Sequence, residues 1–331
     1  MKRVLFISLL MGLTSLVRAQ DVQYSQFYAS PLYLNPAMAG TADQHRIVGN
    51  FRDQWPSIPG AFVSYSLAYD VNLAEANSGL GITIQRDQAG SGGLSTTTLG
   101  GMYAYNIKIN RNLAFRPAIG VAYGVRTVDY TKLKFGDQLL TGNSLSVQSN
   151  SITDQVGYMD LSAGGILYGN NFWAGYSVFH INKPNNSLLG QNNFIDARHS
   201  VHVGYRLPMQ RTVKREVVRS VTIAMNYKAQ GKWDQVDIGG YFLMKPFVMG
   251  IWYRGIPGLK AYKEGYQNND AIVLLAGAHY KSVKFAYSYD VTISKIWGNT
   301  GGSHEISLIY EYINPRKKRK RRRMKLACPK F

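Results

Sequence analysis

The residues of this sequence whose types could support chemistry are few, and their spacing argues against catalysis and metal binding. His199 and His202 stand three apart, which on a β-strand sends the two side chains to opposite faces, so they are poor joint metal ligands. Asp234 and Asp237 resemble a carboxylate pair, but they fall at the start of a predicted strand and also point to opposite faces. The single cysteine, Cys328, excludes a disulfide framework and any multi-cysteine metal site. We therefore expect neither a metal ion nor a cofactor.

Sequence motifs that carry catalytic chemistry are missing as well. The chain contains no H-E-x-x-H zinc motif, no G-x-S-x-G nucleophile elbow and no P-loop. The glycine-rich run at 90–93 precedes a predicted strand instead of opening a helix, so it indicates a flexible loop rather than a phosphate site. We expect a protein that is not an enzyme.

A basic run at the carboxyl end accounts for most of the net charge. The chain of 331 residues carries 38 Lys and Arg against 19 Asp and Glu, a formal net charge of +19. Ten cations lie in 316–330 and three lie in the first 18 residues, which leaves 25 cations against 19 anions in the body. By composition the run resembles a nucleic-acid-binding patch. The amino end of the chain, described below, has the pattern of an export signal, and we therefore expect no nucleic-acid partner. The basic run is either a solvated extension or a docking site for an acidic periplasmic partner or the cell-wall polymer. The residues assigned to docking are Arg316, Lys317, Lys318, Arg319, Lys320, Arg321, Arg322 and Arg323.

The amino end has the pattern of an export signal. Lys2 and Arg3 precede an apolar run over 4–17, and Val17 and Ala19 offer compact residues at the two positions that a signal peptidase reads, with cleavage before Gln20. The alternative, a membrane anchor or buried helix, is disfavoured because the run is too short to span comfortably. No later apolar run exceeds 271–278, so we expect no spanning helix, and the exported chain is then either soluble or a barrel.

Alternation of apolar and polar residues recurs along the rest of the chain, which is typical of half-buried strands. In 283–291, for example, valine and aromatic residues alternate with Lys284, Ala286, Ser288 and Asp290. Apolar residues make up 45% and charged residues only 17% of the chain, and there are 23 tyrosines, which favours an all-β transmembrane antiparallel β-barrel of about 14 strands. The strands are predicted near 46–55, 62–70, 79–86, 95–107, 113–127, 158–168, 171–181, 198–207, 217–228, 233–243, 246–254, 271–280, 283–291 and 304–313.

Connection lengths support the barrel over the alternative of a soluble β-sandwich. Short turns at 108–112, 169–170, 244–245 and 281–282 mostly alternate with long connections at 128–157, 182–197, 255–270 and 292–303, as in barrels with short periplasmic turns and long external loops. Two connections depart from this order, at 229–232 and 208–216. An even number of strands would place both termini on the periplasmic side of the outer membrane. The barrel itself would contact the lipid of that membrane.

The chain is therefore divided into a signal peptide (1–19), an N-terminal segment (20–45), a barrel (46–313) and a basic tail (314–331). The N-terminal segment lacks strand alternation and carries two prolines, so we expect it in or under the lumen rather than as a simple tether. An inner polar network is expected to stiffen the barrel or to contact a partner. The residues assigned to the lumen are Gln23, Tyr24, Ser25, Gln26, Phe27, Asn35 and Pro36, and those assigned to the network are Arg254, Asp290, His304 and Glu305.

Several stretches resemble a known family. The runs Q-Y-S-Q-F-Y at 23–28 and P-L-Y-L-N-P-A-M-A-G at 31–40 are similar to the opening of the PorP/SprF family of type IX secretion membrane proteins. The likeness continues through R-D-Q-W at 52–55, N-F-W-A-G-Y-S at 171–177, W-Y-R at 252–254, A-Y-S-Y-D at 286–290 and G-S-H-E-I-S at 302–307. The long basic tail departs from the family pattern.

The resemblance implies a non-enzymatic outer-membrane component of the type IX secretion and gliding machinery. It implies export or surface attachment of cargo, such as adhesins with a type B C-terminal domain, and contact with periplasmic parts of the apparatus. The alternative that remains open is a general diffusion porin, because small inner residues such as Gly120, Ala122 and Gly124 permit either a pore or a close-packed plug.

Overall fold

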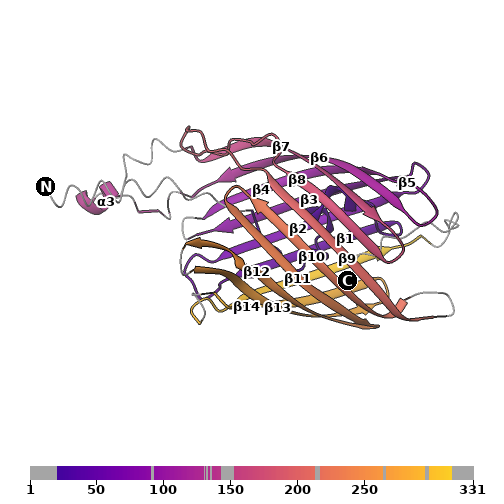
Figure 1. Cartoon of the computed structure of the whole chain (residues 1–331). Helices are drawn as coiled ribbons and strands as arrows, with labels where there is room; N and C mark the ends of the chain where they lie inside the picture. Colours follow the sequence, from indigo (N-terminus) through magenta and orange to yellow (C-terminus); the bar gives the residue numbers. More distant parts are fainter. Residues whose placement is uncertain are drawn as a thin grey trace.

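A computed structural model describes residues 21–90, 93–129, 131, 133–134, 136–142, 153–212, 217–263, 266–294 and 298–314. In this part of the chain, fourteen long strands and one two-residue strand form a single antiparallel sheet that closes on itself (Figure 1). The strands are β1 (His45–Gln54), β2 (Phe62–Leu73), β3 (Ser78–Ala89), β4 (Leu94–Tyr105), β5 (Ile107–Lys108), β6 (Ala114–Thr127), β7 (Gln155–Tyr168), β8 (Phe172–Phe179), β9 (Arg198–Arg211), β10 (Val217–Gln230), β11 (Trp233–Met244), β12 (Phe247–Lys263), β13 (Tyr266–Tyr280), β14 (Val283–Thr292) and β15 (Ser303–Tyr312).

The sheet closes because its first and last strands pair. β1 and β15 are in register over ten residues, from His45 opposite Tyr312 to Gln54 opposite Ser303. Every other long strand pairs with its neighbours in the chain, and β4 pairs directly with β6 across the short β5. The predicted barrel of about fourteen strands is confirmed.

The two ends of the barrel differ. We call the end that carries the β1–β2, β6–β7, β8–β9 and β14–β15 connections the long-loop end, and the opposite end, with the two-residue turns 245–246 and 281–282, the short-turn end. The six-residue helix α3 (Gly136–Thr141) projects from the β6–β7 connection at the long-loop end (Figure 1). The first described residue, Asp21, lies at the long-loop end, whereas β15 runs to the short-turn end.

The expected long loop at 255–270 is wrong. Strands β12 and β13 continue through most of it, with register shifts between Arg254 and Gly255 and between Ile256 and Ala261. Such irregularities let a strand continue past glycine and proline, which the sequence pattern marks as a turn.

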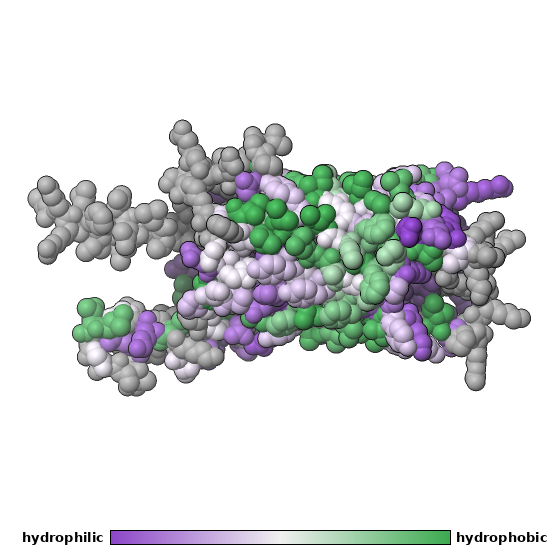
Figure 2. Space-filling view, turned by 90° about the horizontal axis from the view of Figure 1, so that it is seen from below, coloured by the Kyte–Doolittle hydropathy of each residue, from purple (hydrophilic) through white to green (hydrophobic). Residues whose placement is uncertain are grey.

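The wall has an apolar outer face and a polar inner face. In β14, Phe285 and Tyr287 are exposed on the outside, whereas Ser288 and Asp290 are buried inside. Figure 2 shows many hydrophobic residues over the middle of the barrel and a group of strongly hydrophilic residues at the short-turn end, on the right of the view. The two faces predicted for 283–291 are confirmed in β14. Among the described residues, no helix is long and apolar enough to cross a membrane.

Candidate functional site

Residues 21–40, which we call the lumen segment, run through the inside of the barrel. All residues of 24–40 except Tyr33 are buried. The segment contains two short helices, α2 (Pro31–Leu34) and the 3-10 helix η2 (Pro36–Met38). The backbone N–H of Ala37 in η2 donates to the side-chain oxygen of Asn35 at 2.8 Å. A proline at the first position of each helix suits this arrangement, because that position needs no N–H.

Aromatic packing fixes the middle of the lumen segment. The Phe27 ring meets Trp252 of β12 edge-on with centroids 4.8 Å apart, and Tyr28 meets Trp173 of β8 edge-on at 5.6 Å. Tyr241 of β11 completes the group, 5.0 Å from Trp252. The principal apolar core thus lies inside the barrel, between the segment and the wall. Such edge-to-face contacts add to the stabilisation from burial itself.

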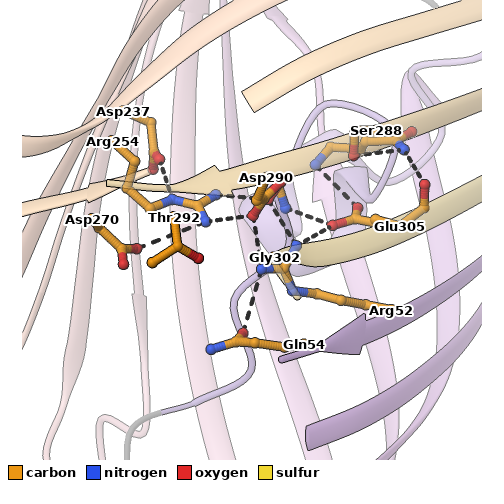
Figure 3. Close-up of polar contacts among 12 residues, drawn as sticks. Arg52, Gln54, Asp237, Arg254, Asp270, Ser288, Asp290, Thr292, Gly302 and Glu305 are labelled. Atoms are coloured by element: carbon orange, nitrogen blue, oxygen red, sulfur yellow. Dashed lines mark hydrogen bonds and ion pairs between the residues drawn. The ribbon is translucent and has the colours of Figure 1, made fainter. Parts of the chain in front are cut away.

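A buried ionic network binds the start of the lumen segment to the wall (Figure 3). The backbone amides of Ser25 and Gln26 donate to the two carboxylate oxygens of Glu305, at 2.7 and 3.0 Å. The Ser25 hydroxyl donates to Asp290 at 2.6 Å, and Arg52 bridges both acids, at 2.9 Å from Asp290 and 3.1 Å from Glu305. These contacts join β1, β14 and β15, so they span the seam where the first and last strands meet.

Arg254 extends the network to the neighbouring strands. Its guanidinium lies 2.8 Å from Asp237 of β11 and 2.9 Å from Asp290 of β14, and it donates to the Ser25 hydroxyl at 2.8 Å. Lys228 of β10 stands 3.9 Å from Asp237. Buried charges of this kind are tolerated when each is paired and hydrogen-bonded. The lumen segment takes part in this network, because the Ser25 hydroxyl accepts hydrogen bonds from both arginines.

The network contains most, but not all, of the residues expected from the sequence. Arg254, Asp290 and Glu305 come together, but His304 does not: it lies on the outer face, with its Nδ1 2.7 Å from the Tyr287 hydroxyl. The reason is the two-residue period of a strand, which sends His304 and Glu305 to opposite sides. Arg52 was missed, although it alternates with the outward Phe51 and faces Glu305 in the β1–β15 register.

The carboxyl half of the lumen segment fits against small residues of the wall. The side-chain Nδ2 of Asn35 donates to the backbone carbonyls of Gly165 at 3.3 Å and Tyr176 at 3.1 Å, and lies 3.1 Å from Nε2 of His202. A Cβ at Gly164 would overlap the Asn35 carbonyl oxygen, so this close approach requires glycine.

Ion pairs and hydrogen bonds fix the segment at the short-turn end. Arg46 forms a salt bridge with Asp70 at 2.7 Å, and the amide of Gly40 donates to the same carboxylate at 2.7 Å. Arg116 of β6 donates to the carbonyls of Ala37, at 2.9 Å, and Ala39.

A second polar group, which we call the Asp21 cluster, lies at the long-loop end. Asp21 accepts hydrogen bonds from His180 at 2.8 Å and from Gln230 at 3.2 Å, and forms an ion pair with Arg198 at 3.1 Å. The other ring nitrogen of His180 lies 3.0 Å from Asp160. Burial lowers the pKa of His180, but the two carboxylates outweigh it and raise that pKa to about 9. His180 is therefore charged at neutral pH and pairs with Asp21.

The arrangement holds a segment of the protein's own chain inside the barrel. Across the described ranges, no three His, Cys, Asp or Glu side chains are grouped closely enough to hold a metal ion. His199 is exposed and His202 buried, so these two histidines lie on opposite faces, as expected. The basic tail residues assigned to periplasmic docking and the export signal lie outside the described residues.

A closed antiparallel barrel with an apolar outer belt and short turns at one end defines an outer-membrane β-barrel protein. The chain belongs to the family of type IX secretion system membrane proteins PorP/SprF, whose model matches residues 16–310. No curated protein matches the sequence.

Three solved structures are similar to this chain at low sequence identity. Omp33 of Acinetobacter baumannii has 8% identity and a TM-score of 0.45, covering 82% of this chain and 100% of its own. The toluene transporter TodX of P. putida has 11% identity and a TM-score of 0.48, covering 85% and 93%. The KdgM porin has 8% identity and a TM-score of 0.39, covering 81% and 99%.

Proposed function

We propose that this protein is a non-enzymatic docking component of the type IX secretion machinery. Its long-loop end binds the C-terminal domain of a secreted cargo protein, such as an adhesin with a type B domain, and its short-turn end and basic tail contact periplasmic parts of the apparatus. Membership of the family carries the assignment to secretion. The observation that favours docking over conduction is the lumen segment, which fills the barrel with the protein's own chain.

Exposed apolar side chains support the long-loop end as the cargo-binding surface. Leu139 and Leu140 of α3 are 72% and 89% exposed, and Leu189 and Phe194 of the β8–β9 connection are also exposed. The two connections are joined by a hydrogen bond from the Thr153 amide to the Leu188 carbonyl at 2.8 Å. Exposed apolar side chains outside the lipid-facing band are typical of surfaces that bind another protein.

The test is an affinity pull-down of tagged protein from its native membrane. The wild type should recover a secreted cargo protein together with secretion components. The double variant Leu139→Ser and Leu140→Ser should lose the cargo and keep the periplasmic components, and Ile109→Ser, an exposed apolar residue at the short-turn end, is the matched control. Recovery of neither cargo nor secretion component by the wild type would overturn the proposal.

The porin alternative has a separate test. Planar bilayers with the purified full chain should show no steady open-channel current, because the lumen segment is anchored at both ends and packed in between. Robust conductance by the wild type would favour the porin and contradict docking.

A further inference from the structure

The lumen segment crosses the whole barrel. Its carboxyl end is bound at the short-turn end, where the Gly40 amide meets Asp70 shortly before β1 begins at His45. Its amino end is bound at the long-loop end, where Asp21 meets the residue after β8, the first residue of β9 and the last residue of β10. The chain therefore enters the lumen at one end and leaves it at the other.

We propose that residues 21–40 are a fifteenth crossing of the outer membrane, which displays the processed amino terminus at the long-loop end, beside the loops. The expectation that both termini lie on the same side is thereby replaced, because fourteen strands and one lumen crossing make an odd number of passages. The inference concerns topology and does not depend on which cargo is bound.

The processed amino terminus is only one residue away from Asp21, so it has little freedom to leave the long-loop end. Cleavage at the predicted site makes Gln20 the first residue, and one residue adds only about 3.8 Å between Cα atoms. Asp21 is bound through its side chain by His180, Arg198 and Gln230, and its own amide donates to the Gln230 side chain at 3.2 Å. A terminus one residue away from such an anchor remains at the same end of the barrel.

The Arg198 side chain adds a further anchor near that end. Its guanidinium lies 4.2 Å from the centre of the Tyr33 ring and 4.3 Å from that of Phe179, and it donates to the Tyr33 carbonyl at 3.2 Å. The Tyr33 hydroxyl in turn donates to the carbonyl of Val22. Arg198 thus binds both the start and the middle of the lumen segment, which opposes withdrawal of the amino end into the lumen.

The direction of the crossing also bears on barrel closure. Ser25 and Gln26 contact β1, β14 and β15 together, across the seam where the sheet closes. In the closed barrel the segment therefore contacts both sides of the seam, and its amino end lies beyond the seam at the long-loop side.

The test inserts the same epitope at three positions of the full chain in its native membrane. One insertion follows Gln20, one follows Gly190 in the β8–β9 connection at the long-loop end, and one follows Arg111 in the turn before β6 at the short-turn end. Antibody binding is measured on intact cells and after the outer membrane is permeabilised. We expect the Gln20 epitope to behave like the Gly190 epitope and opposite to the Arg111 epitope.

Two outcomes overturn the proposal: a Gln20 epitope that matches the Arg111 epitope, or one that reacts from both sides. If the insertion prevents folding, judged by loss of heat-modifiable electrophoretic mobility, single cysteines replace the epitopes in a Cys328→Ser background. Val22→Cys, Gly190→Cys and Arg111→Cys are then labelled with a membrane-impermeant maleimide, and the same comparison decides. Because no cargo is needed, failure of this test leaves the docking proposal to its own pull-down.

Discussion

Glu305 is the residue whose neutralisation tests the anchoring of the lumen segment most directly. It is fully buried and accepts the Ser25 amide at 2.7 Å, the Gln26 amide at 3.0 Å and the Arg52 guanidinium at 3.1 Å. Glu305→Gln keeps the shape of the side chain but removes its charge, and directs an amide NH2 at one of the donors. The change leaves Arg52 paired with Asp290 alone among the acids of the network.

Breaking a buried ion pair from one side costs about 3–5 kcal/mol, because the remaining charge stays buried. We therefore expect Glu305→Gln to lower the free energy of unfolding by about 3–5 kcal/mol, two to four powers of ten in the equilibrium constant. Urea titration in phospholipid vesicles measures it, with tryptophan fluorescence as the signal because Trp252 packs on Phe27 of the lumen segment.

Glu75→Gln is the matched control, because this carboxylate is exposed in the β2–β3 turn, and substitutions of that kind change stability by about 0.5 kcal/mol or less. A Glu305→Gln protein within about 1 kcal/mol of the wild type would refute the conclusion that the ionic network anchors the segment.

Further predictions concern packing, pH and the tail. Gly164→Val should lower the free energy of unfolding by about 1–3 kcal/mol, because a Cβ at this position overlaps the side chain of Asn35. Gly101→Val is the control, since a Cβ there meets nothing within 4 Å. Equal effects of the two variants in the urea titration would contradict the close contact between Gly164 and Asn35. The pKa of His180 is raised to about 9 from its ordinary 6.5, so the stabilisation that charged His180 gives the folded barrel is complete below about pH 6.5 and is lost as pH rises through 9. The difference in urea midpoint between the wild type and His180→Gln should therefore shrink over that range, and a constant difference would count against the pairing of His180 with Asp21. Deleting 316–331 should leave the heat-modifiable barrel intact and reduce recovery of periplasmic components in the pull-down, whereas loss of the folded barrel would assign the tail to assembly.

Local alternation was sufficient to predict the wall of this protein. In a strand, the side of the sheet on which a residue lies depends only on whether its position is odd or even, so Phe285 outside and Asp290 inside follow from their spacing alone. The same reasoning, followed strictly, places His304 outside with Ile306; its assignment to the inner network departed from the period. The prolines and missing alternation of the N-terminal segment likewise excluded a strand there.

Partners that come from distant parts of the chain required the tertiary structure. Arg52 meets Glu305 only because β1 and β15 close the barrel in one particular register, and a pairing between residues 253 positions apart is not encoded in local pattern. The extension of β12 past Gly255 likewise depends on its pairing with β13.

What the sequence by itself determined is the class of the protein: a barrel of about fourteen strands with an apolar outside, a polar inside and a non-strand segment before it. Which way that segment runs was decided only by the tertiary structure. Strand alternation carries no information on the direction in which a segment runs through the lumen. That direction is fixed by the contacts of Asp21 with His180, Arg198 and Gln230, which belong to different parts of the chain and lie together only in the folded barrel.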